Sequence, residues 1–113
     1  MRMELLKSEF SISRLDADAP LPEWPRGDFF SVTRTAEELS IVHQGRGFRC
    51  LKVEGPLDFS LVGILASLTA TLARAEVPVF AISTFDTDYL LVRTEQIERA
   101  IAALEENGHD VRR

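Results

Sequence analysis

One stretch of the sequence, from Glu54 to Val92, holds residues suited to binding a small charged molecule. It is predicted to run from a strand end through a tight turn into a helix, and then into a hairpin with Asp86 and Asp88 at its bend. Unpaired amides at the start of a helix attract an anion, and the helix dipole contributes roughly 0.3–1 kcal/mol at an exposed site. A carboxylate at the bend would attract a cation. The stretch therefore suits a small zwitterion, and we expect an amino acid.

Single residues in this stretch have more than one explanation. Gly63 would leave the backbone open to an approaching anion, or it would relieve crowding between helix and strand. We expect Asp88 to bind the ammonium group, and the alternative is a carboxylate that stabilises the turn. Asp86 is predicted to form the turn, and Thr84 is a candidate hydrogen-bonding group. Phe85 would either line the pocket or contact a second subunit.

The other reactive side chains do not form a catalytic or metal-binding set in the sequence. His43 and His109 have no carboxylate or cysteine at metal-ligand spacing. Asp86 and Asp88 lack the remaining ligands of a calcium loop. Cys50 has no histidine nearby in sequence, so we expect a small core residue rather than a nucleophile. We therefore predict no catalytic residue, no metal and no cofactor.

Composition limits the class of protein and its partners. The chain has 113 residues, 45% hydrophobic and 27% charged, which suits one domain or two very small ones that share a core. A net charge of −5 argues against nucleic acid and against an anionic membrane, because both call for a basic face. There is no run of about 18 apolar residues, and the early charges argue against a signal peptide. With a single cysteine, we expect a cytoplasmic protein.

The hydrophobic pattern predicts the elements that position the candidate residues. Alternating apolar residues predict strands over residues 7–15, 29–34, 39–43, 48–54, 79–84, 89–93 and, at the end, 109–113. Apolar stripes at helical spacing predict one helix from Leu61 to Ala75 and another that begins at Thr94, as its N-cap, and stops at Gly108. We expect Asp58 or Ser60 to cap the first helix.

The segment 16–27 is predicted to be an extended loop, because its prolines remove amide donors and disfavour helix. We expect Trp24 to pin this loop by packing, and the alternative is a ring that stacks on a ligand. The flanking hairpin resembles the later one when the sequence is shifted by 50 residues, through duplication or through chance. The first half lacks helices to cover its strands, so it must pack on the second half or on another chain. This pattern indicates a homodimer.

Three segments of the sequence resemble an ACT domain. They are Val-Glu-Gly-Pro-Leu-Asp-Phe-Ser-Leu-Val-Gly-Ile-Leu-Ala over 53–66, Ala-Glu-Val-Pro-Val-Phe-Ala-Ile-Ser-Thr over 75–84 and Phe-Asp-Thr-Asp-Tyr-Leu-Leu-Val over 85–92. More narrowly, they resemble the tandem ACT branch that includes small bacterial proteins and the cytosolic arginine sensor. The resemblance is close from Phe48 to Val111 and loose over the first 47 residues.

The resemblance implies a fold, a function and a set of site residues. The implied fold class is α+β, with a ferredoxin-like βαββαβ ACT domain over 48–113 after a degenerate, helix-poor ACT-like strand unit over 1–47, both in one structural unit. The implied function is regulation through an amino acid bound where two ACT domains meet. The residues carried over by position are Ser60, Leu61, Val62, Gly63, Ile64, Thr84, Phe85, Asp86, Thr87 and Asp88. The first unit lacks the Gly-rich entry and the helix, which leaves open whether a pocket forms within one chain or between two.

Three functions stay open on the sequence alone. The first is a non-enzymatic, cytoplasmic amino-acid sensor that forms a homodimer and regulates a protein partner by allostery. The second is a structural protein–protein interaction module without a ligand. The third is a small enzyme of ferredoxin-like fold with Asp88 or His43 as a base, although no nucleophile, base and orienting group come together in the sequence. The identity of the amino acid is not encoded in any of these patterns.

Overall fold

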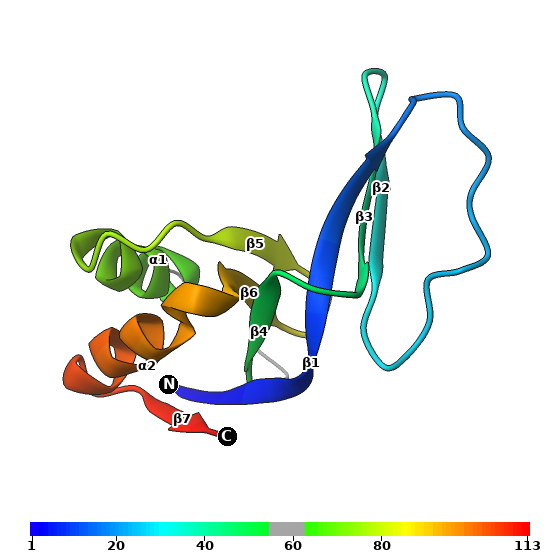
Figure 1. The fold of residues 1–113 in the computed structure, drawn as a ribbon. Helices are drawn as coiled ribbons and strands as arrows, with labels where there is room; N and C mark the ends of the chain where they lie inside the picture. The colour runs from blue at the N-terminus through cyan, green and yellow to red at the C-terminus, as the bar shows by residue number, and fades with distance from the viewer. Residues whose placement is uncertain (55–62) are drawn as a thin grey trace.

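The computed structural model describes residues 1–54 and 63–113, which form a curled, mainly antiparallel sheet with two helices against one face (Figure 1). The strands are β1 (Arg2–Leu15), β2 (Ser31–Arg34), β3 (Leu39–Gln44), β4 (Phe48–Val53), β5 (Phe80–Ser83), β6 (Asp88–Arg93) and β7 (Asp110–Arg112). The helices are α1 (Ile64–Arg74), the short 3-10 helix η1 (Thr94–Gln96) and α2 (Ile97–Glu106). The predicted α+β class with two helices is confirmed.

Strand β1 connects the two halves of the chain. The strands lie in the order β2-β3-β1-β4-β6-β5, and β7 pairs in parallel with the beginning of β1. A ferredoxin-like sheet built from residues 48–113 alone would pair its last strand, β7, with its first, β4. Instead β1 lies between these two strands and pairs with both. The expected βαββαβ arrangement over 48–113 is therefore corrected. β1, a strand from the first half of the chain, completes the sheet formed by the strands of the second half.

The length of β1 also differs from the expectation of residues 7–15. The strand starts at Arg2, because Met3 and Leu5 alternate with polar residues and are buried under the helices. Its pairing with β4 shifts in register between Leu5 and Glu9, as at a β-bulge. Figure 1 shows β1 bending along its length, with the helices and β7 near its first residues and the β2–β3 hairpin near its last.

The helices cover one core. The buried residues of the predicted stripes on the two helices are Leu68, Leu72, Ile97, Ala100, Ile101 and Leu104. The stripe on the second helix is confirmed, as is the described part of the first, whose expected beginning at Leu61 lies outside the described residues. The stop at Gly108, whose φ is 88°, is confirmed too. The predicted N-cap is wrong, because Gln96 occupies the N-cap position of α2. The Thr94 hydroxyl instead donates a hydrogen bond to the Glu9 carboxylate at 3.1 Å, a contact between residues far apart in sequence.

The helix-free face carries a second, aromatic cluster. The Phe29 ring, just before β2, stacks on Tyr89 of β6 with centroids 4.3 Å apart and meets Phe10 of β1 edge-on at 5.6 Å. Cys50 is fully buried in this cluster, as predicted for a small core residue. The outermost strands, β2 and β5, line one cavity of about 270 Å³. The sheet is therefore curled enough for its two edges to approach each other.

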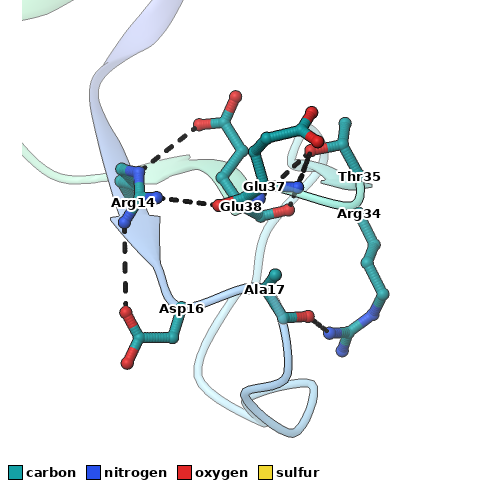
Figure 2. A network of polar contacts seen from close by, with 7 residues as sticks. All are labelled: Arg14, Asp16, Ala17, Arg34, Thr35, Glu37 and Glu38. Atoms are coloured by element: carbon teal, nitrogen blue, oxygen red, sulfur yellow. Dashed lines mark hydrogen bonds and ion pairs between the residues drawn. The ribbon is translucent and has the colours of Figure 1, made fainter.

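Polar contacts fix the segment between β1 and β2 (Figure 2). The Arg34 guanidinium donates hydrogen bonds to the carbonyls of Ala17 and Ala19. Arg14 donates to the carbonyl of Glu37 at 2.8 Å in the turn of the neighbouring hairpin. The Trp24 ring lies edge-on to His43 of β3, with centroids 4.6 Å apart, while 47% of the residue stays exposed. The loop is held against the hairpin, and Trp24 takes part as a packing residue.

The two hairpins close in the same way. The Thr35 amide donates to the Glu38 carbonyl at 2.9 Å, and the Thr84 amide donates to the Thr87 carbonyl at 2.8 Å. In both turns the hydroxyl of the opening threonine also accepts a hydrogen bond from the closing residue: Thr35 accepts from the Glu38 amide, and Thr84 accepts from the Thr87 amide. The two segments therefore share a turn geometry, but Thr35 corresponds to Thr84 and Glu38 to Thr87, so the true shift is 49 residues and the expected shift of 50 is wrong by one.

Candidate functional site

The first wall of the predicted site lies at the start of α1. Ser60, Leu61 and Val62 lie outside the described residues, as does the expected cap Asp58. Gly63 is the N-cap residue of α1, with φ 81° in the left-handed region, and Ile64 is the first residue of the helix. Among the described residues, no heavy atom lies within 4 Å of a Cβ built on Gly63. A positive φ, rather than crowding, explains a glycine at this position.

The N-terminus of α1 offers backbone donors. Within residues 1–54 and 63–113, no side chain caps it, and its first turn contains no acidic residue. The first backbone bond of the helix joins the Ser67 amide to the Gly63 carbonyl at 2.8 Å. The amides that precede Ser67 have no partner inside the helix, as at every helix start. Such amides, together with the positive end of the helix dipole, suit a carboxylate group.

The second wall is the turn between β5 and β6. Thr84 and Thr87 close this turn through backbone and side-chain hydrogen bonds. Thr87 is only 4% exposed, and its hydroxyl donates a hydrogen bond to the Val53 carbonyl at 2.7 Å. Val53 is the last residue of β4, the strand that leads toward α1. This bond fixes the turn beside the end of the strand from which the chain passes to the helix.

The bend itself consists of Phe85 and Asp86, and the expectation that Asp88 also lies at the bend is wrong, because Asp88 is the first residue of β6. Asp88 is half-buried, and its carboxylate accepts a hydrogen bond from the Ser83 hydroxyl at 2.6 Å. Asp86 is exposed at the tip of the turn, and 81% of Phe85 is exposed. One oxygen of Asp88 therefore has a partner, and among the described residues the second oxygen accepts no hydrogen bond, so it can accept one from another donor. Both the ammonium-binding and the turn-stabilising explanations of Asp88 are compatible with this geometry.

Two partners in this site were not predicted as functional residues. Ser83 faces Asp88 as a directly opposed pair of the hairpin, and the two-residue bend between Thr84 and Thr87 is the signal in the sequence that could have revealed this pairing. The Val53 carbonyl, by contrast, meets Thr87 through a long-range contact. No local pattern predicts such a contact.

Residues outside this site do not assemble other chemistry within the described ranges. Burial raises the pKa of the Cys50 thiol to about 12, so the thiol is protonated and unreactive at neutral pH. Among residues 1–54 and 63–113, no group of three histidine, cysteine or acidic side chains is placed to hold a metal ion. In the same ranges, neither helix is long and apolar enough to span a bilayer.

Comparison with solved structures shows the same fold in two bacterial proteins. The crystal structure of protein Atu0741 from Agobacterium tumefaciens is 35% identical in sequence, with a TM-score of 0.88 over 97% of this chain and 90% of that chain. The crystal structure of VC0802 from Vibrio cholerae, a protein of unknown function, has a TM-score of 0.74 over 90% of this chain and 85% of that chain. Its identity of 18% indicates a likeness of fold alone.

Two family models together match most of the chain. A model of an N-terminal domain matches residues 8–45. The model of the ACT domain matches residues 44–106, which include α1, the turn between β5 and β6, and α2. More than half of the sequence is covered by this second match, and the chain therefore belongs to the ACT domain family.

Proposed function

We propose that this protein is a non-enzymatic regulator that binds a small amino acid between the N-terminus of α1 and the turn at Thr84–Asp88. ACT domains are in general regulatory, amino-acid-binding modules, and they are typically not catalytic. The observation that carries the proposal is the hydrogen bond from Thr87 to Val53, which fixes the acidic turn beside the strand end that leads to α1. The amides of α1 would hold the carboxylate of the ligand, and Asp88 would hold its ammonium group.

The proposal extends to the assembly and its setting. ACT domains commonly dimerise, and we expect a cytoplasmic homodimer whose ligand-bound state regulates a protein partner. A second ACT domain would supply the rest of the pocket, because Asp86 and Phe85 are exposed at the tip of the turn. Kinship with the tandem ACT branch that contains the cytosolic arginine sensor is part of this proposal.

A thermal-shift screen with each of the twenty amino acids at millimolar concentration tests the proposal. A ligand at about 100 times its Kd stabilises the folded protein by about 2.7 kcal/mol, which gives a clear rise in Tm. We expect one amino acid, or a chemically related group, to produce this rise. If none of the twenty changes the Tm, the amino-acid-binding function is wrong.

A matched pair of variants separates the charge of Asp88 from its role in the turn. Asp88→Asn removes the charge and keeps an oxygen that accepts the Ser83 hydrogen bond. Ser83→Ala removes that hydrogen bond and keeps the charge. We expect Asp88→Asn to abolish the ligand-induced rise in Tm and Ser83→Ala to retain it. The opposite result would assign Asp88 to the turn alone.

A further inference from the structure

A cavity of about 310 Å³ lies over the aromatic cluster on the helix-free face. Its floor is apolar, because Leu6, Phe10 and Phe29 line it and belong to that cluster. Polar side chains from three segments complete the lining: Glu4, Lys7 and Ser8 from β1, Asp28 from the segment before β2, and Gln44 from the end of β3. An apolar floor with a few polar groups around it is the usual form of a small-molecule site.

The β-bulge of β1 supplies three neighbouring residues to this lining. At the bulge β1 advances by four residues, from Leu5 to Glu9, while β4 advances by two, from residue 51 to residue 49. A regular strand turns alternate residues to opposite faces, but here the consecutive residues 6–8 line the same cavity. The Arg49 guanidinium donates a hydrogen bond at 3.1 Å to the Leu6 carbonyl and so gives this part of the bulge a partner. Bulges redirect side chains in this way and are frequent beside functional sites.

A hydrogen bond between β3 and the bulge fixes one wall of the cavity. The Gln44 side-chain amide donates to the Ser8 hydroxyl at 2.9 Å. Gly27, whose φ is 97°, packs against the same amide, since a Cβ built on this glycine would lie 3.0 Å from the amide nitrogen. This packing positions Asp28, the next residue, at the rim. Among the described residues, the side-chain oxygen of Gln44 accepts no hydrogen bond, so it can accept one from a ligand.

Three charged side chains at the rim have no partner in the described part of the chain. Within residues 1–54 and 63–113, the side chains of Glu4, Lys7 and Asp28 form neither a hydrogen bond nor an ion pair. Lys52 is the cross-strand neighbour of Glu4, but in the described structure it neither lines the cavity nor forms an ion pair with that carboxylate. Two carboxylates against one ammonium leave the lining net negative, so the cavity attracts a cation.

We propose that this cavity binds a small organic amine, with a primary ammonium group at the rim and an apolar stem on the floor. The three hydrogens of a primary ammonium match three acceptors, which are the carboxylates of Glu4 and Asp28 and the amide oxygen of Gln44. The stem packs on the rings of Phe10 and Phe29. No carboxylate is required in this ligand, and the cavity shares no residue with the proposed amino-acid site at α1 and Thr84–Asp88.

An NMR titration of the isotope-labelled full chain with phenethylamine tests the proposal. At millimolar concentration, this charged amine should shift the amide signals of Ser8, Phe29 and their neighbours in a saturable way. Phenethyl alcohol has the same stem without the charge and should bind roughly tenfold more weakly, because it lacks charge-assisted hydrogen bonds. The anion hydrocinnamate should cause no saturable shift. Equal binding of amine and alcohol, binding of the anion, shifts confined to Thr84–Asp88, or no saturable shift with the amine would each overturn the proposal.

Charge variants test the rim itself. Glu4→Gln and Asp28→Asn should each weaken the amine roughly tenfold. The matched control Glu106→Gln removes an exposed carboxylate on α2 and should bind the amine like the natural sequence. Lys7→Met removes the repelling charge, keeps an unbranched stem and should strengthen binding several-fold. Weaker binding to Lys7→Met, or unchanged binding to both carboxylate variants, would contradict the proposed contacts.

The amino-acid response separates this site from the one at α1. Circular dichroism should show that every variant is folded, and Glu4→Gln should keep whatever rise in Tm an amino acid produces in the natural sequence. Amine binding without any amino-acid response would leave this proposal standing and overturn only the proposed function. If Glu4→Gln instead abolished both responses, the two ligands would share one site and the separate amine site would be wrong.

Discussion

The ring of Phe29 stacks on the ring of Tyr89, with centroids 4.3 Å apart and ring planes inclined by 22°. Phe29 precedes β2, near one edge of the sheet, whereas Tyr89 lies on β6, beside the other edge. A single aromatic contact therefore joins elements that are far apart in the strand order. It helps to hold the sheet in its curled form, and with it the cavity that β2 and β5 share.

A double-mutant cycle measures the contribution of this contact. Phe29→Leu and Tyr89→Leu keep apolar side chains but remove the stacked pair. Aromatic pairs contribute about 0.5–1.5 kcal/mol beyond the apolar area that they bury. We expect a coupling energy in that range from urea denaturation of the two single variants and the double variant. A coupling energy near zero would mean that the rings lie in contact without stabilising the curled sheet.

Thr87→Val should destabilise the protein by about 1–3 kcal/mol, because it removes the buried donor to the Val53 carbonyl and leaves that group without this partner. Urea denaturation provides the free energy of unfolding. Thr33→Val is the matched control, since Thr33 is exposed on an edge strand and surface changes usually stay within about 0.5 kcal/mol. Equal effects of the two variants would contradict the role given to the Thr87 hydroxyl.

Glu9 should make the stability of the protein depend on pH under acidic conditions. The Gly47 amide and the Thr94 hydroxyl hold the pKa of Glu9 below its ordinary value of 4.5. A carboxyl group with a lowered pKa in the folded state stabilises the protein above its unfolded pKa, and this contribution is lost as pH falls through the folded pKa. The natural sequence should therefore be more stable than Glu9→Gln above pH 4.5, and this advantage should shrink at lower pH.

Urea denaturation at a series of pH values between neutrality and strong acid measures that difference. Thr94→Val, which removes one of the two donors to Glu9, should raise the pKa of the carboxyl group toward its ordinary value. This variant should reproduce part of the effect of Glu9→Gln. A stability difference between the natural sequence and Glu9→Gln that does not change with pH would show that the carboxylate charge is not involved.

Residues 48–113 should not fold alone, although they contain both helices and most of the region that matches the ACT domain. Without β1, the strands β4 and β7 have no common partner, and Met3 and Leu5 are missing from the core under the helices. We expect circular dichroism of this fragment to show no cooperative thermal transition, in contrast to the full chain. A cooperative transition in the fragment would mean that residues 48–113 form an independent domain.

Local patterns predicted the elements whose signals are local. The stripe on α2, the left-handed stop at Gly108 and the turn of the first hairpin follow from spacing and residue type alone, and the turn of the second hairpin was predicted within one residue. The errors arose where a distant residue decides the outcome. Thr94 looks like an N-cap, but Glu9 takes its hydrogen bond. The place of β1 between β4 and β7 depends on pairings across nearly the whole chain, which no short window contains.

In the candidate site, too, local features were predictable from the sequence and long-range contacts were not. The turn between β5 and β6 was predicted one residue too late, over 85–88, and the sequence suggested an open backbone or relief of crowding at Gly63 rather than a positive φ. The direct evidence that links the turn to β4 is a side-chain contact between Thr87 and Val53, which periodicity cannot predict. The positive φ of Gly63 likewise depends on how the chain enters α1. Residue types were therefore predictable, and their spatial arrangement was not.

The position of β1 also constrains how the protein is made in the cell. Among the described strands, β1 is translated first, whereas its parallel partner β7 is translated last. The edge of β1 that pairs with β7, at residues Arg2–Glu4, therefore stays unpaired until Arg112 has been translated. During that time the nascent chain exposes an unprotected strand edge, which makes the interval between the synthesis of β1 and that of β7 the stage at which aggregation and chaperone capture compete with native folding.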